Sequence, residues 1–437
     1  MTVTVQDDRL YRKVILRIIP FICLCYIIAM IDRLNIGYAK LQFLGDLNLT
    51  EVQFGVAASC FYVGYILFEI PSNLMLHRLG IGLTFLRIMT LWGVTTVLLA
   101  FVTNALHFYG LRFTIGLAEA GFVPGVILYI TYWFPERLRG RMTSIFMVAN
   151  PAAGIIGGPL AGWILTATNN AHGIAGWRYL FLIEGLPAII LGVTAFFYLP
   201  RGPQSATWLT ADEKARIRRD LDAGPVAPNQ QPHTFAGALA SGRVWTFCLV
   251  YFLFFCVLNA LLVWTPTLLR SVGGISIMNI GWLSGAISVV AMIGTLVLGA
   301  HSDRRKERRW HVIGSGLVLG LSFALLPLVS SSLAGTAILL SIASVTAFSF
   351  VALFWTIPSA YLRGTAAAGG LALISSVGAI GGVLSPIFIG YMKDLTGGYY
   401  GALGTFGVAM MLGMPILYAC TRPATRHEQI VATPATP

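Results

Sequence analysis

Charged residues are scarce in this sequence. They make up 11% of the 437 residues, whereas soluble globular proteins carry about 25%. This shortage excludes a soluble globular protein, and the 57% of hydrophobic residues also exclude a disordered chain, collagen or a coiled coil. What remains is an integral membrane protein.

Motifs for catalysis and metal binding are missing as well. The six cysteines lie inside apolar stretches and form no Cys-x-x-Cys pair, so they predict no metal site. There is no Gly-x-x-x-x-Gly-Lys-Ser/Thr loop, no Gly-x-Ser-x-Gly turn and no His-Glu-x-x-His pair. We therefore expect no enzyme and no cofactor apart from protons as a coupling ion.

Long apolar runs dominate what is present. At ~20 residues per span, the chain holds roughly twelve spanning helices. The first run, 14–30, is too long for a signal-peptide core, so we expect it to be retained. We predict an all-α membrane protein with six-helix bundles at 1–199 and 244–437, joined by a polar cytoplasmic linker at 200–243. This plan is typical of transporters with two repeated halves.

The basic residues predict the orientation. Most of the 29 Lys and Arg residues fall in loops that share a side with both termini and the central segment. Such loops are cytoplasmic, so we expect a multi-pass protein of the inner membrane with both termini inside. Lys40 is among the few cations on the opposite side. The net charge of +12 belongs to these loops, so the expected partner is the lipid bilayer and not nucleic acid.

Ionisable residues inside the predicted spans are functional candidates, because a charge at the bilayer centre costs about 3 kcal/mol. All of them lie in the first half: Asp32, Arg33, Glu69, Arg112, Glu119 and Glu184. Glu69 and Glu184 each precede a proline, which favours a packing role at a helix bend. The neutral candidates are Tyr62 and Tyr65 in helix 2, with Tyr251, Asn259, Trp264, Trp355, Ser375 and Ser376 in the second half.

Helical geometry relates the charged candidates to one another. Asp32 and Arg33 are adjacent, so they point ~100° apart; we expect Asp32 to face a neighbouring helix and Arg33 to face a central cavity. Arg112 and Glu119 share one face of a helix predicted over 107–133, about 10 Å apart. Protonation of an acid would free an arginine to pair with a substrate carboxylate. The alternative is an ion network that only joins two helices.

Five stretches carry a resemblance to a known family. They are DRLNIGYA (32–39), FEIPSNLMLHRLG (68–80), LRFTIGLAEAGFVPG (111–125), GWRYLFLIEGLPA (176–188) and GAHSDRRKERRWH (299–311). With them the chain resembles the major facilitator superfamily, and within it the anion:cation symporter family, close to its tartrate-type and sugar-acid members. The resemblance implies two six-helix bundles, alternating access and proton-driven uptake of organic anions.

The resemblance also implies roles for single residues. It links Asp32 and Glu119 to protonation, makes Arg33 the ligand of the substrate carboxylate, and matches Arg112 to the helix-4 arginine. The remaining matches are Asn150 and Tyr251 at polar substrate positions, and Arg78, Asp303 and Arg304 in gating loops.

Two departures from the family pattern stand out. His77 occupies a position where the superfamily has Asp. In helix 11, residues 375–379 read Ser-Ser-Val-Gly-Ala, where family members often have Asn-Ser-x-Gly-Asn. The missing amides would bind substrate hydroxyls, so their loss favours a smaller, more apolar or aromatic carboxylate.

These observations together predict a proton-coupled symporter, working as a monomer, that imports a small organic carboxylate such as tartrate, a sugar acid or a related hydroxy acid. The alternatives are a proton-independent facilitator or exchanger, and uptake of aromatic carboxylates. A membrane sensor would need a soluble output domain, and the longest polar segment is only the central loop. A cation exporter would not need Arg33 beside the acids.

Overall fold

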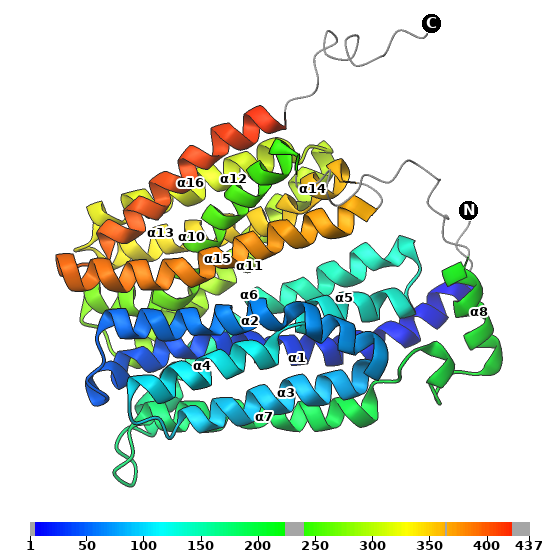
Figure 1. Ribbon diagram of the computed structural model, residues 1–437, viewed down its shortest axis with the longest axis horizontal. Coiled ribbons are helices and arrows are strands. Elements are labelled where there is room, and N and C mark those ends of the chain that lie inside the picture. Colours follow the sequence, from blue (N-terminus) through cyan, green and yellow to red (C-terminus); the bar gives the residue numbers. More distant parts are fainter. Residues whose placement is uncertain (1–4, 223–239, 363–364, 422–437) are drawn as a thin grey trace, which may run out of the picture.

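The protein is a set of helices that run between two opposite ends of the molecule, as the computed structural model shows (Figure 1). The structure describes residues 5–222, 240–362 and 365–421. Within these ranges, twelve helical stretches are long and apolar enough to span a membrane, which confirms the predicted fold class. α1 begins and α16 ends at the same end of the molecule (Figure 1). We call this end the terminal face, and the opposite end the distal face.

Two bundles of six spans share the chain. The N-terminal bundle contains α1 (Val5–Asp46), α2 (Glu51–Leu79), α3 (Ile81–Leu99), α4 (Ala105–Glu119), α5 (Phe122–Trp133), α6 (Glu136–Ala167) and α7 (Gly176–Tyr198). The C-terminal bundle contains α10 (Gly242–Gly273), α11 (Ile277–Arg305), α12 (Arg309–Leu325), η2 (Leu326–Val329), α13 (Leu333–Phe354), α14 (Thr356–Tyr361), α15 (Thr365–Thr396) and α16 (Tyr400–Cys420). The pairs α4–α5 and α13–α14 each form one span.

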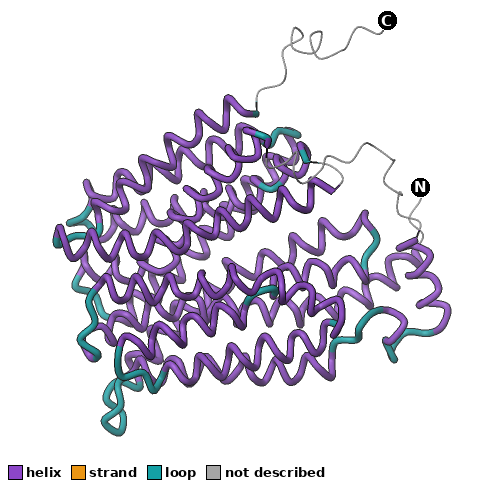
Figure 2. Tube along the Cα trace, in the orientation of Figure 1, coloured by secondary structure: helices purple, strands orange, loops and turns teal. Residues whose placement is uncertain are grey.

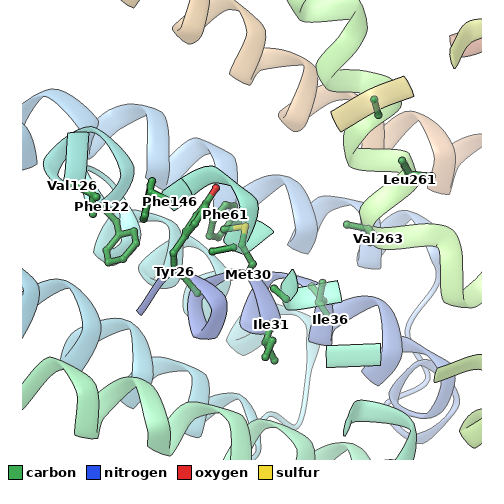
Figure 3. Close-up of a cluster of buried hydrophobic side chains, with 14 of the residues drawn as sticks. Tyr26, Met30, Ile31, Ile36, Phe61, Phe122, Val126, Phe146, Leu261 and Val263 are labelled. Carbon is green, nitrogen blue, oxygen red and sulfur yellow. The ribbon is translucent and has the colours of Figure 1, made fainter. Parts of the chain in front are cut away.

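The span predicted as one helix over 107–133 is broken in two, so that prediction is wrong at this point. α4 ends at Glu119 and α5 begins at Phe122, and the break is the short loop inside the N-terminal bundle in Figure 2. Gly121 takes a φ of 86°, a left-handed conformation that favours glycine. Phe122 anchors the new helix, because its ring lies 6.2 Å from that of Tyr26 on α1 (Figure 3). Glu119 is thereby the last residue of a helix.

Glycines bring α2 and α4 into backbone contact. A Cβ on Gly116 of α4 would overlap the carbonyl oxygen of Phe61, and a Cβ on Gly64 of α2 would overlap that of Phe113. Small residues allow this approach in membrane helices. The contact fixes α4, which carries two of the charged candidates, against α2.

Gly116→Ala is expected to destabilise the protein by about 1–3 kcal/mol, because the added methyl group meets backbone that cannot rotate away. Gly110→Ala is the matched control on the same helix, since a Cβ there meets nothing within 4 Å. The control should be neutral or stabilising by up to about 1 kcal/mol. Thermal unfolding in detergent measures both, and equal melting temperatures would contradict the packing argument.

Part of the central linker docks on the N-terminal bundle. η1 (Pro203–Ser205) and α8 (Ala211–Asp222) lie between the bundles in sequence. Lys13 of α1 forms an ion pair with Glu213 of α8 at 2.9 Å, and this hydrogen bond lowers the pKa of Glu213. Trp208 also stacks on Trp133, with 5.6 Å between ring centroids. The linker therefore contains an ordered helix at the terminal face.

The two bundles meet in their distal halves. A Cβ on Gly158 of α6 would lie 2.7 Å from the carbonyl oxygen of Gly281 of α11, and Gly55 of α2 lies directly against the backbone of Pro386 on α15. Each of these positions lies nearer the distal end of its helix. The structure is therefore closed between the bundles on the distal side.

Candidate functional site

The centre of the candidate site is an ion pair between α1 and the broken span. Arg33 Nε and Nη2 lie 2.7 and 2.6 Å from the same oxygen of Glu119. The side chain of Glu119 is 2% exposed and that of Arg33 is 27% exposed. Glu119 also lies at the carboxyl end of α4, where the helix dipole disfavours a negative charge. Arg33 therefore neutralises the charge of a carboxylate that is almost fully buried.

Asp32 points to the other side of α1. It is 3% exposed and accepts hydrogen bonds from Asn35 Nδ2 at 3.1 Å and from the Thr96 hydroxyl of α3 at 3.2 Å. The structure thus places Asp32 against a neighbouring helix and leaves Arg33 as the partly exposed member of the adjacent pair. Sequence reasoning did not identify Asn35 or Thr96, although Asn35 lies one helical turn after Asp32.

Arg112 lies in the same region of the N-terminal bundle. It is 5% exposed, and its Nε has no hydrogen-bond partner within the described residues. The ring of Phe61 lies 5.0 Å from the guanidinium of Arg112 and 5.3 Å from that of Arg33. Phe61 therefore holds both cations by cation–π contact. Sequence reasoning missed Phe61, since one apolar ring among many carries no signal of its own.

The two predicted tyrosines of α2 have different surroundings. We call Asp32, Arg33, Arg112 and Glu119 the charged cluster. The ring of Tyr65 lies 5.6 Å from the guanidinium of Arg33, so Tyr65 borders this cluster. Tyr62 contacts the C-terminal bundle, where its ring packs against Gly382 of α15 and lies 6.1 Å from that of Phe255. The charged cluster therefore adjoins the surface along which the bundles meet.

A cluster of aromatic side chains lies in the C-terminal bundle, around Tyr251 of α10. Tyr251 of α10 stacks on Phe354, with 5.1 Å between ring centroids, and contacts Trp355 edge-on at 4.8 Å. The Tyr251 ring also packs on Gly378 of α15, where a Cβ would collide with it. The structure thus brings the predicted residues Tyr251 and Trp355 together. They lie beside residues 375–379 of α15, the segment that departs from the family pattern.

The other neutral candidates are spread out. Asn259 is 1% exposed, and its Nδ2 donates to the carbonyl of Gly382 at 3.2 Å, so it links α10 to α15. Ser375 and Ser376 are half-buried on α15. Asn150 of α6 lines a cavity between the bundles, together with residues of α1, α10, α11 and α13.

The three predicted gating residues lie at the terminal face. Arg78 and Arg304 are exposed. Asp303, near the end of α11, pairs with Arg308, which directly precedes α12. The side chain of His77 lies outside the described residues. These placements leave the gating role a prediction.

A buried cluster at the distal face was not predicted. Lys40 was expected in a loop region, but it is 3% exposed inside α1 and pairs with Glu51 at 2.7 Å. Its ammonium lies 4.8–5.2 Å from the ring centroids of Phe54, Trp264 and Tyr399, and the Tyr399 hydroxyl donates to Glu51. Because Trp264 and Tyr399 come from the C-terminal bundle, we call these five residues the distal latch.

Comparisons with known proteins agree with this architecture. Residues 22–386 match the sequence profile of the Major Facilitator Superfamily. A protein of Pseudomonas putida whose name includes "metabolite transport protein NicT" is 41% identical over 410 residues, 94% of each chain. A protein of Agrobacterium vitis whose name includes "tartrate transporter" is 40% identical over 428 residues, 98% of each chain. A bacterial homolog of the human lysosomal transporter Spinster, crystallised in an inward-facing and occupied conformation, superposes with a TM-score of 0.75 at 17% identity, covering 93% of this chain and 96% of that one.

Proposed function

We propose that this protein is a proton-coupled symporter that imports a small organic carboxylate. The chain belongs to the major facilitator superfamily and is a multi-pass membrane transporter rather than an enzyme. The Arg33–Glu119 ion pair is the observation that carries this proposal. A guanidinium that is partly exposed can change partners, and the carboxylate that now holds it is buried. Tartrate, named in one relative, is the first substrate to test.

The exchange of partners at Arg33 supplies the coupling. A substrate carboxylate that pairs with Arg33 displaces Glu119. A buried carboxylate that has lost its partner costs about 3–5 kcal/mol, so Glu119 takes up a proton when the substrate binds. Protonation of Glu119 therefore raises the affinity for substrate, and substrate binding raises the proton affinity of Glu119 by the same factor. Asp32, held beside Thr96 and Asn35, is the second acid that binds a proton.

The direction of transport follows from the orientation. The basic loops of the terminal face support a cytoplasmic location for this face in a bacterial-type inner membrane. With that orientation, the closed distal side corresponds to a protein closed to the outside. A membrane potential contributes about 2.3 kcal/mol per net charge per 100 mV. Import therefore gains from the potential when more protons than substrate charges enter. We propose that one monomer suffices for this cycle.

The substrate class has a second candidate. Two features favour an aromatic carboxylate over a polyhydroxylated acid. They are the cluster of aromatic rings around Tyr251 and Trp355 and the absence of asparagine at positions 375 and 379 of α15. Thermal stabilisation of the purified protein by tartrate, gluconate and benzoate separates these classes, since a ligand at 100 times its Kd stabilises by about 2.7 kcal/mol.

Asp32→Asn is expected to reduce proton-driven tartrate uptake at least about tenfold and to reduce tartrate exchange less, because the neutral amide cannot release a proton. The measurement is uptake into proteoliposomes with and without an imposed proton gradient. Glu69→Gln, a half-buried acid of α2, is the control. Wild-type uptake that ignores the gradient would reject symport in favour of a facilitator or exchanger.

A further inference from the structure

Glu184 of α7 is a buried acid with no ion-pair partner among the described residues. It is 4% exposed, and neither of its carboxyl oxygens has a hydrogen-bond partner within the described residues. The next residue, Gly185, packs so closely on α3 that a Cβ there would lie 2.9 Å from the carbonyl oxygen of Gly93. Because α3 and α7 touch through their backbones here, the side chain of Glu184 is held within the bundle.

The polar neighbours of Glu184 include Asp32 and Asn35 of α1. Asn35 lies beside Glu184 and also donates to Asp32 Oδ1 at 3.1 Å, so this amide stands between the two acids. The titratable groups that face Glu184 are Asp32 and Tyr38, both on α1. α3 and α6 also pack on α7. Their charged residues lie toward the terminal face and not beside Glu184: Arg87 on α3, which donates to Ser72 of α2, and Glu136, Arg137, Arg139 and Arg141 in the first turns of α6. Glu184 therefore faces another acid and no cation.

Charge balance accounts for this arrangement. Glu119 neutralises Arg33, which leaves Asp32 and Glu184 with one remaining cation of the cluster, Arg112. An ionised carboxyl group that is buried without a partner costs several kcal/mol. The two acids therefore balance Arg112 when they carry one proton and one negative charge between them.

We propose that Asp32 and Glu184 form a proton-sharing pair, so that α7 supplies a third acid to the coupling mechanism; this deepens the proposed function and rests on it. The proton leaves the carboxyl group of Glu184 and binds the carboxylate of Asp32, and the reverse step restores it. The charge of the pair stays at minus one while the proton moves between the two acids, and it changes by one only when the pair exchanges that proton with the aqueous side during the transport cycle. The pair is the proton store on the α1–α7 contact, while Glu119 responds to the substrate through Arg33.

Infrared spectroscopy of the full-length protein in lipid tests the shared proton without transport. The wild type should show the carbonyl band of a protonated carboxyl group at neutral pH. Glu184→Gln and Asp32→Asn should each abolish this band, because the acid that remains then balances Arg112 as a carboxylate. Glu69→Gln is the matched control, since Glu69 also precedes a proline within a span but belongs to a different helix, α2. A band that survives unchanged in Glu184→Gln would overturn the proposal.

Proteoliposome uptake then tests the role in coupling. A pH gradient of one unit contributes about tenfold to accumulation for each coupled proton. Glu184→Gln should therefore accumulate about tenfold less tartrate than the wild type under that gradient, with a smaller loss in exchange. Equal accumulation would show that Glu184 only packs at a helix bend. If wild-type uptake ignores the gradient, the proposed function fails, whereas the infrared result still decides whether the acids share a proton.

Discussion

Arg33→Gln is expected to weaken tartrate uptake and binding by about 100-fold. Removing one partner of a buried, hydrogen-bonded charge pair costs roughly 2–5 kcal/mol, and each 1.4 kcal/mol is tenfold. Arg33→Lys should lose about tenfold, because lysine keeps the charge but cannot offer two parallel donors to a carboxylate. Initial rates of uptake and thermal stabilisation by tartrate measure the two effects.

Loss of binding can be separated from loss of fold at this site. Arg33→Gln leaves Glu119 buried without its cation, so the melting temperature should fall. Glu119→Gln alone should still bind tartrate, with less dependence on pH, because Arg33 no longer has an internal partner. The double variant Arg33→Gln/Glu119→Gln should be more stable than Arg33→Gln alone, but it should not regain tartrate binding. Arg270→Gln, at an exposed position of α10, is the control for removal of an arginine. Tartrate binding by the double variant at wild-type affinity would contradict Arg33 as the carboxylate ligand.

Local geometry explains why part of the site could be predicted. The opposite directions of Asp32 and Arg33 follow from the 100° turn between adjacent helical residues, and the cost of burying charge requires each to have a partner. The break after Glu119 was missed because the residues on both sides of it, 113–118 and 120–133, are mostly apolar and read as one continuous span. Its signal is Gly121 followed by Pro124, since glycine at a helix end and proline in the first turn of the next helix indicate a restart.

Burial of the distal latch could not be predicted in this way. Lys40 lies near the end of an apolar run, and hydropathy alone places such a lysine at the membrane surface. Its surroundings come from helices far apart in the sequence, since Trp264 belongs to α10 and Tyr399 precedes α16. Only the packing of the two bundles brings these rings around the ammonium.

Lys40→Gln is expected to shift the protein toward a state that is open on the distal side. The ammonium of Lys40 contacts Trp264 and Tyr399 across the bundle interface, and a desolvated cation–π contact contributes about 2 kcal/mol. These contacts exist only while the distal side is closed, so their loss should raise the ratio of open to closed protein by about tenfold or more. The ion pair with Glu51 lies within the N-terminal bundle and therefore does not favour either state by itself.

Spin labels on the two bundles measure this shift as a change in distance. Gly45→Cys on α1 and Gly401→Cys on α16 are exposed distal positions where a Cβ makes no close contact, and the six native cysteines are replaced by serine. Lys40→Gln should populate longer distances. Lys393→Gln is the matched control: its ammonium lies 4.8 Å from the same Tyr399 ring, but both residues belong to the C-terminal bundle, so loss of this contact should favour neither state. Identical distance distributions in the two variants would show that the contacts of Lys40 across the bundle interface do not hold the distal side closed.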